Sequence, residues 1–184
     1  MSSWVPWKLE IRPSLLNSGD KKRRIKIMFG LFKKKVKIKD YCRKKYDFIF
    51  SANGRKIMDD LVKQCNVSLG EEQRDKYRDH FIAAFFQLAG VAFSRTISQD
   101  LRYEVMSFNK EYLEEKKASH IDEISRIYNS AFGSSFQDGI KPMAQVIAGK
   151  ILADSSPVEN IFYDAFYGII EAFFTDLKGI RLIS

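Results

Sequence analysis

The chain has 184 residues, of which 45% are hydrophobic and 29% charged, a composition that excludes wholesale disorder and suffices for one domain with its own core. Its net charge of +8 is concentrated at the front, because residues 1–39 hold 12 Lys and Arg against two Asp and Glu, whereas residues 40–184 carry a net charge of −2. Cys42 and Cys65 lack the spacing of a metal or redox site, and the sequence has no run of about 18 apolar residues that would span a membrane.

Residues 1–27 have no helical or alternating periodicity and hold both tryptophans, so we interpret them as an irregular leader. Arg23 and Arg24 can each be encoded by AGG, and the pair would then form the core of a bacterial ribosome-binding site three codons before Met28. We therefore hypothesise that translation starts at Met28 rather than at Met1, and that the leader is not native coding sequence. The opening "MFGLFKKK" is typical of a bacterial cytosolic protein.

Residues 28–50 are expected to form a basic, amphipathic N-terminal arm. On a helix, Phe29, Phe32 and Val36 share one face surrounded by lysines, which is the pattern of a short helix lying in a membrane interface. The same lysines would also suit nucleic-acid phosphates, but the near-neutral remainder has no nucleic-acid-binding motif. In a third interpretation the arm is solvated and only its apolar residues pack on the bundle. The side chains expected to contact an anionic surface are Phe29, Phe32, Lys33, Lys34, Lys35, Lys37 and Lys39.

Two helices are expected next, over residues 51–66 and 68–97. The first ends at Asn66, and the second begins with a capping box formed by Ser68 and Glu71. Gly90 would weaken the second helix locally or allow a close helix crossing. The expected inward faces are Ile57, Met58, Leu61, Val62 and Cys65 in the first helix, and Tyr77, Phe81, Ala84, Phe85, Leu88, Ala92 and Phe93 in the second.

Three shorter helical segments follow this pair. Ser98 is expected to cap the first, Ser119 to begin the second, and Pro142 to lie in the first turn of the third, over residues 138–154. The expected inward faces are Leu101, Val105, Phe108 and Tyr112, then Ile121, Ile124, Ile127, Tyr128, Ala131 and Phe132, and finally Ile140, Met143, Ile147 and Ile151.

The last helix begins with a second capping box, formed by Ser156 and Glu159, and is the most apolar segment of the chain. Its polar residues form one narrow stripe, so we predict that it is the central helix of the bundle. The alternative is that one of its faces forms a dimer interface. The stripe consists of Asn160, Asp164, Glu171 and Thr175.

No set of residues points to a reaction. His80 and His120 are interpreted as surface histidines, and the acids Asp164 and Glu171 as the solvated side of a helix rather than as a paired-carboxylate site. No P-loop, dinucleotide fingerprint or nucleophile elbow is present. The sequence therefore nominates no catalytic, cofactor-binding or metal-ligating residue.

The prediction is an all-α protein, a single compact bundle of about five or six helices over residues 51–184 behind the leader and the arm. The favoured function is a non-enzymatic interaction or regulatory module in the cytoplasm, which binds a protein partner or self-associates as a homodimer through helical faces. The alternative is a peripheral protein anchored to the inner face of the membrane by residues 28–45. A third hypothesis is a binder of an apolar ligand, or an enzyme, that uses the Phe-rich core.

Overall fold

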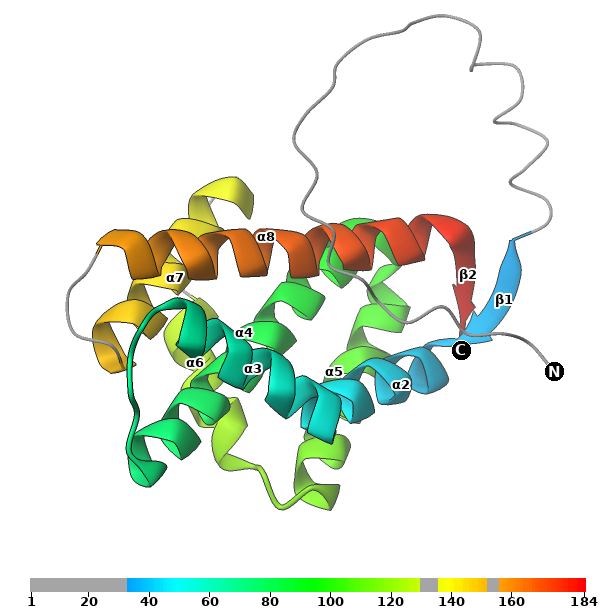
Figure 1. Ribbon diagram of the computed structural model, residues 1–184. Helices are drawn as coiled ribbons and strands as arrows, with labels where there is room; N and C mark the ends of the chain where they lie inside the picture. The colour runs from blue at the N-terminus through cyan, green and yellow to red at the C-terminus, as the bar shows by residue number, and fades with distance from the viewer. Residues whose placement is uncertain (1–32, 130–135, 152–155) are drawn as a thin grey trace, which may run out of the picture. The chain divides into compact units, whose positions relative to one another are not determined.

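The computed structural model describes residues 33–129, 136–151 and 156–184, and in this part of the chain it contains seven helices and two short strands (Figure 1). The prediction of an all-α fold is confirmed. In chain order the elements are β1 (Lys34–Lys37), α2 (Ile38–Phe50), α3 (Ala52–Gln64), α4 (Glu71–Thr96), α5 (Gln99–Glu115), α6 (His120–Asn129), α7 (Phe136–Ile151), α8 (Ser156–Gly179) and β2 (Ile180–Ile183).

Residues Lys34–Ser184 form one compact unit. Residues 34–50, expected in the N-terminal arm, instead supply β1 and α2 of this unit. One face of α2 is buried, because apolar and aromatic residues recur at helical spacing between the exposed lysines. The leader, Phe29 and Phe32 lie outside the described residues. The buried face of α2 consists of Ile38, Tyr41, Cys42, Tyr46 and Ile49.

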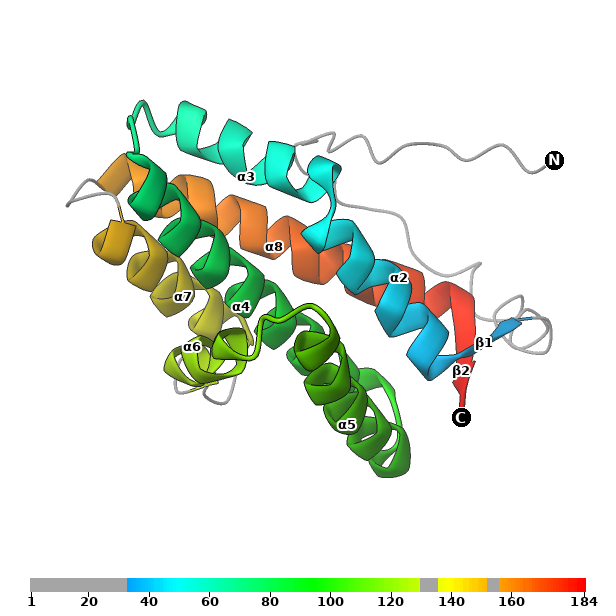
Figure 2. The same cartoon turned by 90° about the horizontal axis from the view of Figure 1, so that it is seen from below.

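The centre of the bundle is α4, not α8 as the sequence suggested. Residues 80–86 of α4 are all buried, so two of its turns have no exposed side. Helices α3, α5, α6, α7 and α8 all pack against it, and Figure 2 shows α7 and α8 running alongside it. The predicted inward face of α4 is confirmed in full, but its opposite face is buried as well. That second buried face includes His80, so the prediction that His80 is a surface histidine is wrong.

Helix α8 packs on α7 and α4 along a single stripe of apolar side chains. The predicted polar stripe is exposed, and the aromatic and aliphatic residues between the two stripes are half-buried. This partial exposure shows that α8 lies at the periphery of the bundle. Its buried stripe consists of Val158, Phe162, Phe166, Ile170, Phe173 and Leu177.

The connections between helices depend on local hydrogen bonds. The Ser51 side chain caps α3 by accepting from the Gly54 N–H, and Asn66 adopts a left-handed conformation (φ 54°) just after α3 ends. Helix α4 starts at Glu71 rather than near Ser68, and the Gly70 N–H donates to Oε1 of Gln73 (3.2 Å). The predicted capping box at Ser68 is therefore wrong by two residues, whereas the predicted helix end at Asn66 is confirmed.

The remaining predictions concern α5 to α8. Val105, Phe108 and Tyr112 are buried as expected, and Ser98 lies at the N-cap of α5. Helix α7 begins earlier than predicted, so Pro142 lies inside it rather than in its first turn. Ile127, expected to face inward, is 39% exposed. Of the other expected inward residues, Ala131 and Phe132 lie outside the described part, as does the side chain of Ile151.

Strands β1 and β2 pair in parallel, and sequence reasoning did not predict them. They come from nearly opposite ends of the described chain and are joined through the whole bundle, which is the long crossover that a parallel pair requires. The register sets Lys34 beside Ile180, Lys35 beside Arg181, Val36 beside Leu182 and Lys37 beside Ile183. In Figure 1 this pair lies at the C-terminal end of α8.

Candidate functional site

The two-stranded ribbon, β1 with β2, has one apolar and one cationic face. Successive side chains of a strand point to opposite faces, and paired residues of a parallel ladder share a face. Val36, Ile180 and Leu182 are partly buried against the core. The register therefore sets Lys35, Lys37 and Arg181 together on the opposite face, where all three are exposed. We call these three residues the cationic face of the ribbon.

The cations of the ribbon and of the start of α2 have no acidic partner among the described residues. Within the described residues, Lys34, Lys35, Lys37, Lys39 and Arg181 make no ion pair. By contrast, Lys45 pairs with Asp176, and Arg43 pairs with Glu115 at 3.0 Å. Two acids lie beside them: the exposed Asp40 in the first turn of α2, and the half-buried Glu104, which accepts from the Ser184 hydroxyl (2.8 Å) just after β2. The ribbon and the start of α2 thus form a surface with an excess of uncompensated positive charge.

The structure distributes the predicted lysine contacts between β1, the residue before it and the start of α2, rather than along one helix. Lys33 precedes β1, Lys34, Lys35 and Lys37 lie in it, and Lys39 lies in the first turn of α2; all are exposed. Val36, predicted on a helical face, lies in a strand and packs against the core, because the run Lys-Val-Lys pairs with β2. Sequence reasoning missed Arg181. The alternation in "IRLI" after α8 was the signal that could have found it.

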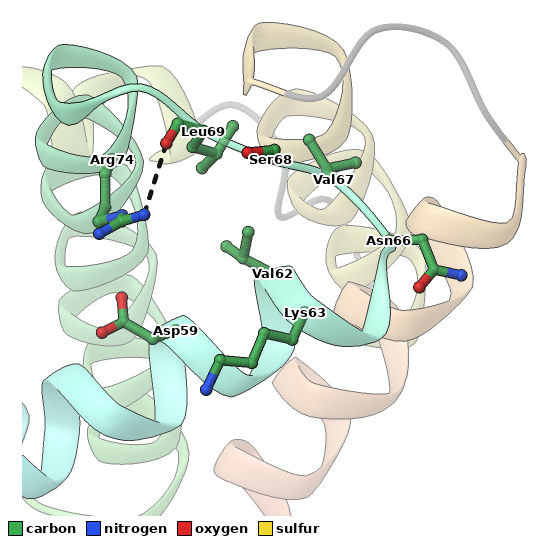
Figure 3. A pocket seen from close by; sticks show the side chains of 8 residues that line it. All are labelled: Asp59, Val62, Lys63, Asn66, Val67, Ser68, Leu69 and Arg74. Atoms are coloured by element: carbon green, nitrogen blue, oxygen red, sulfur yellow. Dashed lines mark hydrogen bonds between the residues drawn. The ribbon is translucent and has the colours of Figure 1, made fainter.

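A second candidate site is a cleft of about 470 Å³ between α3 and the start of α4 (Figure 3). Helix α3 contributes Asp59, Val62 and Lys63, the connecting residues 66–69 form the far wall, and Arg74 of α4 closes one side. In Figure 3 the side chain of Val62 points into the cleft. The cleft thus combines an aliphatic floor with a charged rim.

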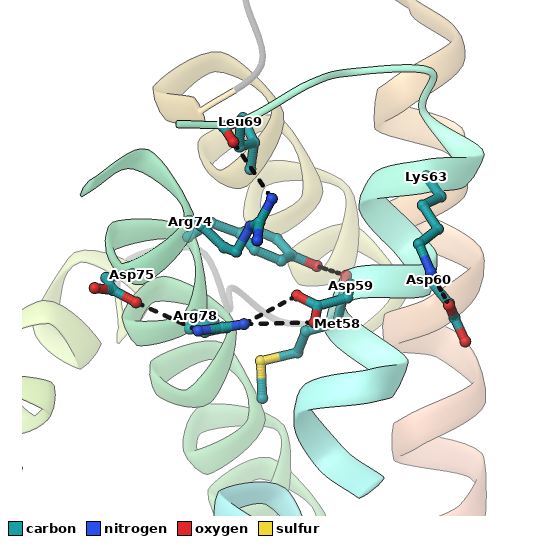
Figure 4. Close-up of polar contacts among 9 residues, drawn as sticks. Met58, Asp59, Asp60, Lys63, Leu69, Arg74, Asp75 and Arg78 are labelled. Carbon is teal, nitrogen blue, oxygen red and sulfur yellow. Dashed lines mark hydrogen bonds and ion pairs between the residues drawn. The ribbon is translucent and has the colours of Figure 1, made fainter. Parts of the chain in front are cut away.

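Polar contacts fix the α3–α4 wall of this cleft (Figure 4). The Arg78 guanidinium donates to both oxygens of Asp59 (3.2 and 3.4 Å) and to Asp75 (3.3 Å), and the Tyr77 hydroxyl donates to the Met58 carbonyl (3.1 Å). These bonds link α3 to α4 at two successive residues of each helix. Contacts within the protein therefore hold this wall in place.

The histidines and cysteines occupy structural positions. Nδ1 of His80 lies 2.9 Å from the Tyr128 hydroxyl in the α4–α6 interface, and Nε2 of His120 lies 3.0 Å from Asp79. Burial raises the pKa of the Cys42 thiol to about 12, although its hydrogen bond with Tyr46 acts in the opposite direction. In the part of the chain that the structure describes, no three His, Cys, Asp or Glu side chains gather as metal ligands would.

Comparison with protein-family models, with curated proteins and with solved structures finds no match to this chain. Among the described helices, none is both long and apolar enough to cross a membrane. Function is therefore inferred from the geometry of the cationic ribbon and of the cleft.

Proposed function

We propose that this protein is a non-enzymatic binding module that docks on an anionic lipid surface through the cationic face of its ribbon. The observation that carries the proposal is the register that sets Lys35 beside Arg181, with Lys37 on the same side, all exposed and without ion-pair partners in the described structure. Lys39, in the first turn of α2, adds one exposed charge nearby. The partner is defined by its chemistry, a membrane rich in anionic headgroups.

The expected strength of docking follows from the number of charges. Each Lys or Arg near an anionic membrane contributes about 1 kcal/mol. The three residues of the cationic face and Lys39, partly offset by Asp40, therefore give about 3–4 kcal/mol, which corresponds to millimolar, reversible attachment. Attachment of this kind is salt-sensitive, because the Debye length falls to about 3 Å at 1 M salt.

Two features favour lipid over nucleic acid as the anionic partner. Ile183, which is half-buried, lies beside Lys37 on the same side of the ribbon, and an apolar Phe-Gly-Leu-Phe run directly precedes Lys33 in the sequence. Apolar residues next to lysines suit the interface between headgroups and acyl chains. Binding to nucleic-acid phosphates would make no use of them.

Co-sedimentation of the full-length protein with vesicles tests this proposal. We expect binding to phosphatidylcholine vesicles that contain phosphatidylglycerol, little binding to pure phosphatidylcholine, and loss of binding on raising the salt from about 50 to 500 mM, since screening shortens the range of the attraction. Failure to bind the anionic vesicles at low salt would overturn the proposal. Tighter binding to a mixed-sequence DNA duplex than to the vesicles would overturn the assignment to lipid.

Self-association through helical faces stays a prediction. The half-buried aromatic residues of α8, among them the stacked pair Tyr163 and Tyr167 (ring centroids 6.3 Å apart), are the surface on which it would depend. This proposal and lipid docking involve different elements of the fold and are compatible with each other.

A further inference from the structure

The cleft between α3 and α4 has the size and the mixed lining of a small-ligand site. Ligand pockets commonly measure about 300–1,000 Å³ and combine an apolar surface with a few polar groups that fix orientation. Here Val62 and Leu69 are buried, and Val67 is half-buried, beside the Ser68 hydroxyl and the charged side chains of the rim. This lining suits a short aliphatic chain that ends in a charged group.

The charges around the cleft are unequally compensated. Both oxygens of Asp59 accept from Arg78, which also donates to Asp75, so one guanidinium is shared by two carboxylates and part of the Asp59 charge remains beside the cleft (Figure 4). Lys63, at the rim of the cleft, pairs with Asp60 at 3.0 Å. Of the two cations that line the cleft, Arg74 is the one without an acidic partner among the described residues.

The side chain of Arg74 makes one polar contact among the described residues, a long hydrogen bond from Nη2 to the Leu69 carbonyl (3.4 Å). No acidic side chain in this part of the structure pairs with it. A guanidinium has five N–H donors in a planar fork that matches a carboxylate in a bidentate manner. Arg74 therefore holds its donors at the rim of the cleft, next to the aliphatic floor (Figure 3).

We propose that this cleft binds a small organic monocarboxylate, with Arg74 holding the carboxylate and Val62, Val67 and Leu69 covering a short aliphatic chain. One uncompensated cation matches one negative charge, and the nearby Asp59 carboxylate disfavours a dianion such as phosphate. The α3–α4 contacts fix the wall before any ligand arrives, so little ordering is needed on binding. This proposal is independent of lipid docking by the ribbon, which lies on other elements.

The test is a titration of the full-length protein, followed by amide chemical shifts, with hexanoate, hexanol and inorganic phosphate as probes. We expect hexanoate to shift the amides of Val62, Ser68, Leu69 and Arg74, and to bind at least about tenfold more tightly than either other probe. Equal binding of hexanol, tighter binding of phosphate, or hexanoate shifts confined to other residues would overturn the proposal.

Variants of the same chain show whether Arg74 holds the anion. Arg74→Gln should weaken hexanoate binding about tenfold, and Arg74→Lys should recover part of the loss, because a lysine keeps the charge but not the fork. Arg55→Gln removes an exposed arginine of α3 that does not line the cleft, so it should leave the affinity unchanged. Equal affinities of the Arg74→Gln variant and the unchanged protein would overturn the role of Arg74. An unchanged unfolding midpoint establishes that each variant is folded.

Discussion

At the residue scale, the two cysteines differ in their access to solvent. Cys42 is fully buried on α2, and burial raises the pKa of its thiol to about 12, whereas Cys65 at the end of α3 is only partly buried. Thiol reagents attack the thiolate. At pH 8 we expect DTNB to modify Cys65 in the folded protein and Cys42 only after unfolding. Cys65→Ser should abolish the early phase, and equal rates for both thiols would contradict this assignment.

Buried tyrosines make the fold sensitive to alkaline pH. Burial raises the pKa of Tyr41, Tyr46, Tyr77, Tyr112 and Tyr128. In the unfolded chain these groups ionise near pH 10. Because the raised pKa values belong to the folded state, the stability that they contribute is complete below about pH 10 and is lost as the pH rises further.

These five hydroxyls should ionise only when the chain unfolds, so their share of the tyrosinate absorbance at 295 nm should rise together with the loss of helical circular dichroism. A smooth ionisation of all eight tyrosines near pH 10 with the helical signal intact would contradict this expectation.

At the element scale, the corner between α2 and α3 depends on one glycine. A Cβ atom at Gly54 would lie 2.6 Å from the Phe48 carbonyl oxygen and would also strike that of Ile49, both backbone atoms that cannot move aside. We expect Gly54→Ala to lower the free energy of unfolding by about 3 kcal/mol, as overpacking does. The measurement is urea denaturation followed by circular dichroism.

Gly90→Ala is the matched control. Nothing lies within 4 Å of a Cβ at this exposed position of α4, so the close helix crossing considered for Gly90 is absent and the substitution should stabilise the helix by up to about 1 kcal/mol. A similar loss of stability in both variants would contradict the assignment of the cost to the crowded corner at Gly54.

Periodicity found the helices but not their depth in the bundle. The spacing of apolar residues identified the inward face of α4. Its second buried face includes His80 and alanines, residue types that are also common on exposed helix faces, so the pattern does not predict that this face is buried. His80 is buried because the Tyr128 hydroxyl of α6 supplies a hydrogen-bond partner, and this pairing of residues 48 positions apart is invisible to local reasoning. Conversely, α8 is apolar but half-exposed, since its neighbours cover only one stripe.

At the scale of the whole molecule, the cationic face forms because residues from distant parts of the chain meet. The local sequence predicts that the lysines of residues 33–39 contact an anionic surface, but it predicts a helix for them. The strand is not predictable locally, because its partner β2 follows α8. Pairing with β2 turns Val36 inward and adds Arg181. The cleft could not be predicted either, because Arg74 becomes a rim residue only through the packing of α4 on α3.

The most direct measurement compares two variants of equal net charge in the vesicle assay. The first variant removes the three charges of the cationic face and is Lys35→Gln/Lys37→Gln/Arg181→Gln. The second variant removes one exposed cation from each of α3, α4 and α6 and is Arg55→Gln/Lys76→Gln/Arg126→Gln. Loss of about 1 kcal/mol per residue predicts that the first variant binds phosphatidylglycerol-containing vesicles about a hundredfold more weakly. The second variant should change by less than about threefold, since its charges lie away from the ribbon. Equal losses in both variants would contradict docking through the ribbon.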